Sequence, residues 1–221
     1  MKITILYDSY KYKKLAKLRT GWGFSCLIET GEKDILFDTG WDGNILLNNM
    51  NYLGFNPEKI DIVVISHYHW DHCGGLPQLL GIDKKVDVYV PKSFSTHLKS
   101  EIRYRANLIE VIEPTKICDD VYTTGELGTD IKEQSIILKT DNGLIVITGC
   151  AHPGIRTILK VASNYGRVFG LIGGFHGFKE FYLISDISFI MPCHCTRYKK
   201  NLAKLFPQKY IENGIGKEMK F

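Results

Sequence analysis

The chain has 221 residues, of which 44% are hydrophobic and 24% charged, a composition typical of a globular protein with one core. Its 28 basic and 24 acidic residues give a net charge of +4, too balanced to indicate nucleic-acid binding, and no apolar run approaches the roughly 20 residues of a membrane span. The apolar run before Asp8 is too short for a secretory signal. We therefore expect a single soluble, cytoplasmic domain over residues 1–221.

The first half of the chain shows short apolar runs separated by turn residues, a pattern that predicts strands. Strands are expected at 3–7, 26–29, 34–37 and 62–65. The turn 30–33 joins the second and third of these into a hairpin. A helix is expected over 44–53, ended by Gly54, and a second begins near Leu76, after Gly74 and Gly75 allow a tight turn.

The second half repeats a similar order. Asp141-Asn142-Gly143 is a strong hairpin signal between apolar runs. The expected elements are strands at 135–139, 144–148, 168–172 and, as the last strand, 188–191, a helix at 154–163, and a basic helix from about residue 197. Two hairpin-containing halves with amphipathic helices resemble a weak duplication. They predict an α+β fold with two sheets packed face to face and helices outside, a four-layer αββα sandwich.

The segment 66–75, SHYHWDHCGG, carries the densest set of metal-binding residue types. His67 and His69 follow a strand two residues apart, so in extended backbone their side chains share one side and can bind one ion. Asp71 and His72 follow where the chain turns, which aims them at a second ion, as in two-metal hydrolytic sites. The spacing therefore predicts a metal site.

This motif, with Gly74-Gly75-Leu76 after it and Phe37-Asp38-Thr39-Gly40 before it, resembles the motif of the metallo-β-lactamase superfamily. The resemblance covers most of the chain. It implies the αββα fold, with metal at the loop edge of the two sheets and Asp38 supporting the site. It also implies these metal ligands: His67 and His69 for the first ion, and Asp71 and His72 for the second.

The resemblance further implies ligands from the second half, His152 for the first ion and His194 for the second. The family usually has an aspartate bridging the ions, just after a strand that ends in Thr-Gly. Here Cys150 has a comparable setting, so it bridges as a thiolate, binds one ion only, or is a bystander. A thiolate favours zinc, whereas imidazoles and carboxylates also accept iron or manganese. We expect two divalent metal ions, zinc foremost, with a mononuclear site as the alternative.

His176, in Gly173-Gly174-Phe175-His176, is a candidate ligand or a catalytic acid that faces the substrate. The alternative is an exposed histidine in a glycine-rich turn. Cys193 and Cys195 flank His194, and extended backbone would place both on the side opposite to it. We therefore interpret these two cysteines as small apolar packing residues.

The combination TGCAHPGI, GGFH, PCHCT and GWGFS looks most like the branch of the superfamily that includes dihydropterin-6-methyl-4-(ribofuranosyl)aminobenzene 5′-phosphate synthase. We nevertheless favour a hydrolase acting on a small anionic or phosphorylated substrate, with no nucleic-acid or membrane partner. Metal ions would lower the pKa of a bound water toward about 7. Asp71 would orient that water or accept its proton.

Two alternatives remain open. The first is a condensing enzyme of the pterin pathway, in which the metals activate a leaving group in place of water. The second is a non-catalytic metal or thiol sensor that responds through Cys150. The basic segment with Lys11, Lys13 and Arg19 would suit a phosphate-bearing substrate, although a charge run usually faces water.

Overall fold

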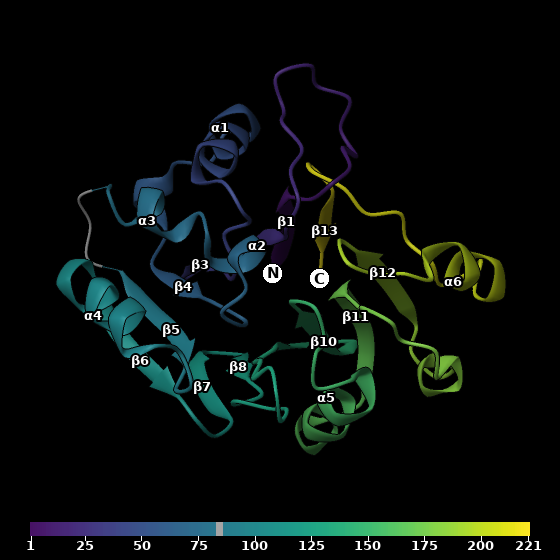
Figure 1. The fold of residues 1–221 in the computed structure, drawn as a ribbon. Helices are drawn as coiled ribbons and strands as arrows, with labels where there is room; N and C mark the ends of the chain where they lie inside the picture. The colour runs from purple at the N-terminus through teal and green to yellow at the C-terminus, as the bar shows by residue number, and fades with distance from the viewer. Residues whose placement is uncertain (83–85) are drawn as a thin grey trace. The chain divides into compact units, whose positions relative to one another are not determined.

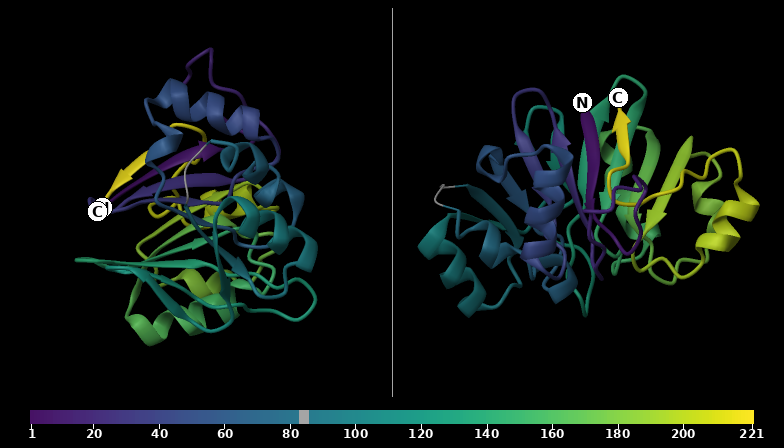
Figure 2. Two further views of the ribbon diagram at one scale, coloured as in Figure 1. Left: turned by 90° about the vertical axis from the view of Figure 1, so that its left-hand side faces the viewer. Right: turned by 90° about the horizontal axis from the view of Figure 1, so that it is seen from above.

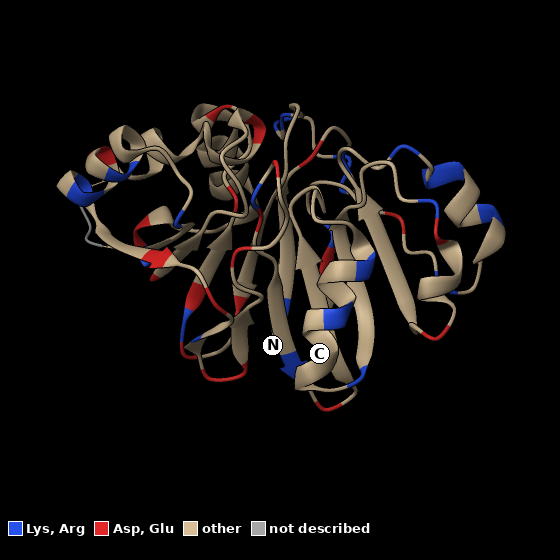
Figure 3. Cartoon of the chain, turned by 60° about the horizontal axis from the view of Figure 1, so that its bottom comes forward, with Lys and Arg blue, Asp and Glu red and all other residues tan. Residues whose placement is uncertain are grey.

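The computed structural model describes residues 1–82 and 86–221, in which the chain forms two compact units (Figure 1). Unit 1 comprises Met1–Ile112 and Gly214–Lys220, and unit 2 comprises Glu113–Asn213 and Phe221. Lys and Arg residues occur on some of the helices and on loops in both units (Figure 3). Among the described residues, none of the helices has the length and apolarity that crossing a membrane requires.

Unit 1 contains a seven-stranded sheet with the order β13-β1-β2-β3-β4-β5-β6. The strands are β1 (Lys2–Tyr7), β2 (Ser25–Glu29), β3 (Asp34–Phe37), β4 (Ile62–Val64), β5 (Asp87–Pro91), β6 (Asn107–Val111) and β13 (Glu218–Lys220). Pairing is antiparallel from β13 to β3 and parallel from β3 to β6. The carboxyl ends of the parallel strands therefore share one edge of the sheet.

The helices of unit 1 bury apolar residues against this sheet. They are α1 (Gly43–Leu53), α2 (Trp70–Cys73), α3 (Leu76–Leu79), α4 (Thr96–Arg105) and the 3₁₀ turn η1 (Pro57–Lys59). Figure 2 shows α1 on one face of the sheet, where Leu46 and Met50, one helical turn apart, enter the core. The side chain of Asp42 caps the first turn of α1, and Gly54, at φ 85°, ends it.

Unit 2 contains a six-stranded sheet with the order β12-β11-β10-β9-β8-β7. The strands are β7 (Thr115–Cys118), β8 (Val121–Thr123), β9 (Ile136–Thr140), β10 (Gly143–Thr148), β11 (Val168–Gly174) and β12 (Phe189–Cys193). Pairing is parallel among β10, β11 and β12 and antiparallel elsewhere. The carboxyl ends of three adjacent strands thus meet at one edge.

The helices of unit 2 share one hydrophobic core with the parallel strands. They are α5 (Ile155–Ala162), α6 (Lys199–Leu205), η2 (Ser163–Tyr165) and η3 (Phe181–Ile184). Ile158 of α5 and Leu202 of α6 join a cluster with Val146, Leu171 and Ile190 of the three strands. Because these strand residues lie on one face, both helices cover that face.

The recurring order predicted from the sequence is present in both units. In unit 1 the hairpin of β2 and β3 is followed by α1 and the parallel strand β4, and in unit 2 the hairpin of β9 and β10 is followed by α5 and the parallel strand β11. A hairpin, a helix and a parallel strand therefore form the repeated segment.

One strand prediction is wrong, and several elements are missed. The strand at 188–191 is not the last, because β13 follows it and pairs with β1. In β13 both Glu218 and Lys220 are exposed, so no apolar pattern indicates a strand. The helix α4 is missed because it buries only Ile102 and has a polar composition. Such a helix lacks the apolar stripe that sequence analysis depends on.

The basic segment before β2 is mostly exposed, as favoured from the sequence. Lys11 forms a bridge with Ile215, and Lys13 Nζ lies 2.5 Å from Glu218 Oε1. Lys17 lies over the ring of Tyr52. These contacts fasten the segment to unit 1 and leave its charged groups in water.

Candidate metal centre

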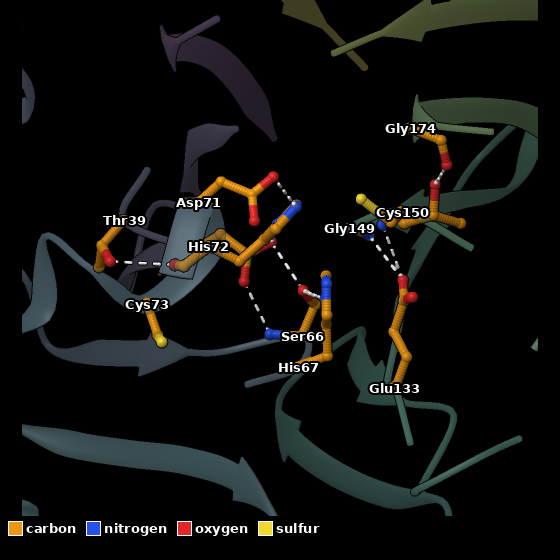
Figure 4. Close-up of polar contacts among 12 residues, drawn as sticks. Thr39, Ser66, His67, Asp71, His72, Cys73, Glu133, Gly149, Cys150 and Gly174 are labelled. Atoms are coloured by element: carbon orange, nitrogen blue, oxygen red, sulfur yellow. Dashed lines mark hydrogen bonds and ion pairs between the residues drawn. The ribbon is translucent and has the colours of Figure 1, made fainter. Parts of the chain in front are cut away.

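The histidine motif of unit 1 forms the loop that leaves β4 and the short helix α2 that follows it (Figure 4). The ring centroids of His67 and His69 are 4.7 Å apart, and those of His67 and His72 are 4.3 Å apart. His67 and His72 are fully buried. The structure therefore brings three of the predicted imidazole ligands into one cluster, at the edge where β3 and β4 end.

Asp38, directly after β3, holds this cluster through a fully buried carboxylate. Its Oδ1 accepts the Ser66 backbone N–H at 2.7 Å, and its Oδ2 lies 2.8 Å from Ser66 Oγ and 2.6 Å from His72 Nδ1. Burial raises the pKa of Asp38, while His72 and Ser66 lower it. Because its backbone has φ 57°, Asp38 adopts the left-handed region that aspartate tolerates better than most residues.

This hydrogen-bond network decides which nitrogen of each ring remains for metal. A carboxylate oxygen only accepts, so His72 Nδ1 donates to Asp38 and the neutral ring carries no proton on Nε2. Ser66 Oγ likewise donates to Asp38, so His67 Nδ1, 2.8 Å from Ser66 Oγ, donates to the serine. Both histidines therefore present an unprotonated Nε2, the form that binds metal.

Asp71 lies in the first turn of α2, beside the ring of His72. Its Oδ2 is 3.7 Å from His72 Nε2, and its side chain remains partly exposed. Its backbone carbonyl accepts the N–H of Phe24 at 3.4 Å. The carboxylate thus lies on the same side of His72 as the nitrogen that is available for metal.

The two glycines after the histidine motif allow two backbone segments to approach each other closely. They are not needed for the tight turn that the sequence predicted. Gly74 and Gly75 both have ordinary right-handed helical backbone angles. A Cβ on Gly74 would lie 2.3 Å from the carbonyl oxygen of Trp41, and one on Gly75 would lie 2.4 Å from that of Thr39. Only glycine allows these backbone segments to pack so tightly.

Cys73 has a structural environment. Its thiol donates to the carbonyl of Tyr68 at 3.4 Å, and the side chain belongs to the hydrophobic core of unit 1. Burial, and secondarily the carboxylates of Asp38 and Asp71, raises its pKa to about 12. A thiol in this setting stays protonated and packs as a small apolar group.

The candidate residues of unit 2 come from three loops, each following one of its parallel strands. Cys150 and His152 follow β10, His176 follows β11, and His194 follows β12. The ring centroids of His152 and His176 are 5.1 Å apart. The shared edge of the three strands therefore brings together residues that are up to 44 positions apart in the sequence, from Cys150 to His194.

Glu133, which the sequence analysis missed, fixes the first of these loops (Figure 4). The residue is fully buried, and its backbone pairs with Leu127. Its Oε1 accepts the N–H groups of Gly149, Cys150 and Ala151 at 3.1, 3.0 and 2.9 Å. Its Oε2 accepts the N–H of His152 at 2.8 Å. One carboxylate thus satisfies four consecutive backbone donors and sets the path of the loop.

The other two loops are joined to the first by further hydrogen bonds. Gly174 N–H donates to Gly149 O at 3.0 Å, and Phe175 N–H donates to Thr196 Oγ1 at 2.9 Å. Arg197 N–H donates to His176 O at 2.9 Å. These bonds hold the three loops as one assembly within unit 2.

The premise behind the prediction for Cys193 and Cys195 is wrong. His194 has φ 43°, so the chain is not extended there and simple alternation of sides does not apply. Cys193 is nevertheless fully buried at the end of β12, as expected of a packing residue. Cys195 is half-buried, and its sulfur lies 3.9 Å from the carbonyl oxygen of Cys150. His176 also has a left-handed backbone, at φ 43°, and is exposed.

The donor set of unit 1 fits a divalent transition metal. Imidazole nitrogens and a carboxylate are the ligands that zinc, iron and manganese share, and each buried ring is oriented by a second hydrogen bond through Nδ1. In unit 2, the thiol of Cys150 and the imidazoles of His152 and His194 are also metal-binding residue types. The sequence motif includes the donors of unit 1 and Ser66, whereas Glu133, which orients the loop of Cys150 and His152, lies in no recognisable pattern.

Comparisons with known proteins agree with this chemistry. The family model described as the metallo-beta-lactamase superfamily matches residues 21–159. The uncharacterised protein MJ0448 of Methanocaldococcus jannaschii is 31% identical to this chain, over 97% of this chain and 98% of its own length. The 7,8-dihydropterin-6-methyl-4-(β-D-ribofuranosyl)-aminobenzene-5′-phosphate synthase of the same organism is 29% identical, over 70% of each chain.

A solved structure extends the similarity to the whole fold. Tm1679, described as a metal-dependent hydrolase of the β-lactamase superfamily, aligns with a TM-score of 0.80 at 26% identity, over 100% of this chain and 99% of its own. These matches confirm the predicted resemblance and the predicted fold class. The chain belongs to the metallo-β-lactamase superfamily.

Proposed function

We propose that this protein is a metal-dependent hydrolase that acts on a small anionic or phosphorylated substrate. The observation that carries the proposal is the pair of hydrogen-bond chains from Asp38, which leave Nε2 of His67 and of His72 unprotonated. Burial of this arrangement costs free energy, which a bound metal repays through coordination. Membership of a superfamily that generally binds metal ions supports the same reading.

The proposed ligand set is the one that the resemblance to the superfamily implies. His67, His69 and His152 would hold a first ion, and Asp71, His72 and His194 would hold a second. Cys150 would bridge the ions, hold one of them, or be a bystander. Because a thiolate is a soft ligand, we propose zinc as the native metal, with iron or manganese as alternatives if Cys150 does not bind.

When bound, divalent ions acidify water and polarise the oxygen under attack. The protein supplies orientation and proton transfer. The second oxygen of the Asp71 carboxylate accepts the proton of the attacking water, since it lies in a partly exposed position beside His72. His176, exposed at the end of β11, donates a proton to the leaving group.

The first experiment is elemental analysis of the purified protein, without added metal or chelator. Close to two ions per chain supports the dinuclear site, and close to one ion means that Cys150 does not bridge.

The variant Asp71→Ala should abolish turnover in a screen of phosphoesters, thioesters and lactones while retaining metal at the first position. His97→Ala, a histidine outside the motif, is the control. Turnover that survives in Asp71→Ala would refute the role of this carboxylate.

A second candidate function is a condensing reaction. It is favoured by the similarity to the dihydropterin-aminobenzene-phosphate synthase, which covers 70% of this chain. Reaction in ¹⁸O-labelled water separates the two functions. A hydrolase places one ¹⁸O atom in the acid product of each turnover. A condensing enzyme joins two substrates and places no ¹⁸O in the joined product.

We also propose that residues 1–221 fold as one domain. The chain leaves unit 1 after Ile112, forms unit 2 and returns to unit 1 at Gly214. The chain therefore connects the two units twice, and both ends of unit 2 are joined to unit 1. Bringing these two ends together costs conformational entropy if unit 2 folds without unit 1. A single transition in urea, reported equally by tryptophan fluorescence and by circular dichroism, would support one domain, and two separate transitions would contradict it.

A further inference from the structure

Unit 2 contains a cavity of about 360 Å³ beside its candidate residues. Its lining includes His152 and His176 together with Ile155, Phe178, Lys179 and Glu180. Its volume falls in the range of small-molecule sites. The cavity therefore has room for a part of the substrate that does not itself react.

The apolar wall of the cavity is held in place. Phe178 packs edge-on against Phe175 at 6.3 Å and against Phe181 at 5.8 Å between ring centroids. Ile155 is buried in the hydrophobic core of unit 2. A fixed phenyl ring beside an aliphatic side chain favours a flat, apolar or aromatic group.

The charged side chains at the cavity leave an excess of positive charge. Glu180 is paired with Arg156, and the hydrogen bond from Arg156 is the main cause of its lowered pKa. Lys179 lies over the ring of Tyr198 at 5.4 Å and takes part in none of the ion pairs among the described residues. The helix α5 begins at the cavity, and no side chain caps it. A lysine and a helix N-terminus both attract an anion.

Two glycines keep the cavity open. Gly154 and Gly177 both line it, and a Cβ on either would have no atom within 4 Å. Gly154 has φ 84°, whereas Gly177 lies outside the left-handed region. A side chain at 177, in the lining of the cavity, would therefore meet open space and would not strain the backbone.

We propose that this cavity binds an anionic ester whose anionic group is attached to an aromatic body, such as an aryl phosphate. Lys179 and the N-terminus of α5 bind the anion, and Phe178 and Ile155 contact the ring. His152 and His176 also line the cavity, and the reacting bond would be placed beside them. This assignment of substrate class rests on the proposed hydrolase function, although binding in the cavity can be measured without turnover.

The test is a titration of the full chain, stripped of metal, with phenyl phosphate, followed through ¹³C-labelled isoleucine methyl groups. The methyl resonance of Ile155, assigned with Ile155→Val, should shift and saturate. Lys179→Ala should weaken binding about tenfold, the effect of losing one partly exposed charge contact. Phenol, which has the ring without the anion, should bind more weakly and equally well to both proteins.

A matched pair of variants tests the location. Gly177→Leu should fill the cavity and abolish the shift, while Gly177→Ala should preserve it. No shift of Ile155 in the wild-type protein, or an equal shift in Gly177→Leu, would overturn the proposal.

The outcomes also separate this proposal from the hydrolase function. A protein that binds metal and hydrolyses esters but shows no Ile155 shift keeps its function and loses this substrate pocket. A protein that shows the shift, equally in Asp71→Ala, but neither binds metal nor turns over any ester keeps the pocket and loses the function.

Discussion

The two groups of candidate residues are held in different ways. In unit 1, the four candidate residues lie within a stretch of six, and two of them, His67 and His72, are oriented by the side chains of Asp38 and Ser66. In unit 2, residues from three loops are positioned by bonds to the backbone, above all through Glu133. Candidate residues that are neighbours in the sequence need only their rings oriented, whereas candidates from separate loops need those loops held in place. Removal of Asp38 should therefore affect mainly metal binding, and removal of Glu133 should affect mainly the stability of the fold.

The largest effect is expected from Glu133→Ala. Four buried backbone N–H groups lose their acceptor, so the free energy of unfolding should fall by about 3–5 kcal/mol, the range for removing one partner of a buried charged contact. Urea denaturation measures the change. Glu212→Ala, which removes an exposed carboxylate of the same unit, should change stability by less than about 0.5 kcal/mol. A loss below about 1 kcal/mol for Glu133→Ala would contradict the role of this residue.

The second-largest loss of stability is expected where a glycine of either unit packs closely against another backbone segment. In unit 2, a Cβ on Gly173 would lie 2.1 Å from Thr148 O, and the residue has φ 118°. Gly173→Ala should therefore destabilise the protein by about 2–4 kcal/mol, through overpacking and backbone strain together. In unit 1, Gly74→Ala meets Trp41 O at 2.3 Å with ordinary backbone angles. It should cost about 1–3 kcal/mol. Thermal unfolding of both variants, with Gly177→Ala as the neutral control, decides whether Gly173 is the more sensitive position.

Asp38→Asn should impair metal binding more than folding. The amide nitrogen that replaces Oδ2 donates two hydrogen bonds, so it reverses both hydrogen-bond chains and moves the protons of His67 and His72 onto Nε2. Zinc affinity should fall about 10- to 100-fold, as is typical when a residue that orients a ligand is changed. Competition against a fluorescent chelator measures it.

The matched control for this prediction is Asp141→Asn, in the exposed turn between β9 and β10. It should leave zinc affinity unchanged. If Asp38→Asn binds zinc within about twofold of the wild type, the assignment of the tautomers is wrong. If it instead fails to fold, Asp38 supports unit 1 as Glu133 supports unit 2, and the contrast between the units disappears.

The smallest effect lies away from both groups, at Glu110 on β6. A hydrogen bond from Lys99 is the main cause of its lowered pKa, and Arg103 also contributes. A carboxyl pKa below the unfolded value, near 4.3, stabilises the fold above that pH, and the contribution is lost as the pH falls through the folded pKa. Glu110→Gln should thus cost a few tenths of a kcal/mol at pH 7, and less at an acidic pH at which the folded carboxyl becomes protonated. Urea denaturation at both pH values measures this, and an equal cost at both would show that the effect is not electrostatic.

The sequence by itself determined the family, the hairpins and the residue types of the site. Alternating apolar residues around Asp141-Asn142-Gly143 fix a hairpin locally, and the spacing of His67, His69, Asp71 and His72 is a local property of one loop. Such features depend on neighbours along the chain, so a pattern in the sequence is enough to find them. The polar helix α4 and the charged strand β13 were missed for the same reason, because their stability comes from distant partners.

Only the tertiary structure decided how the candidate residues are supported. Glu133 lies 16 to 19 positions from the N–H groups that it accepts, and Asp38 lies 34 positions from His72. A lone glutamate or aspartate in a sequence is most often a solvated surface charge, and nothing in its neighbours distinguishes a buried one. The cavity beside His152 and the left-handed backbone of His194 likewise exist only once β10, β11 and β12 bring their loops to one edge. Burial and long-range hydrogen bonds create these features, and neither is a property of a short segment.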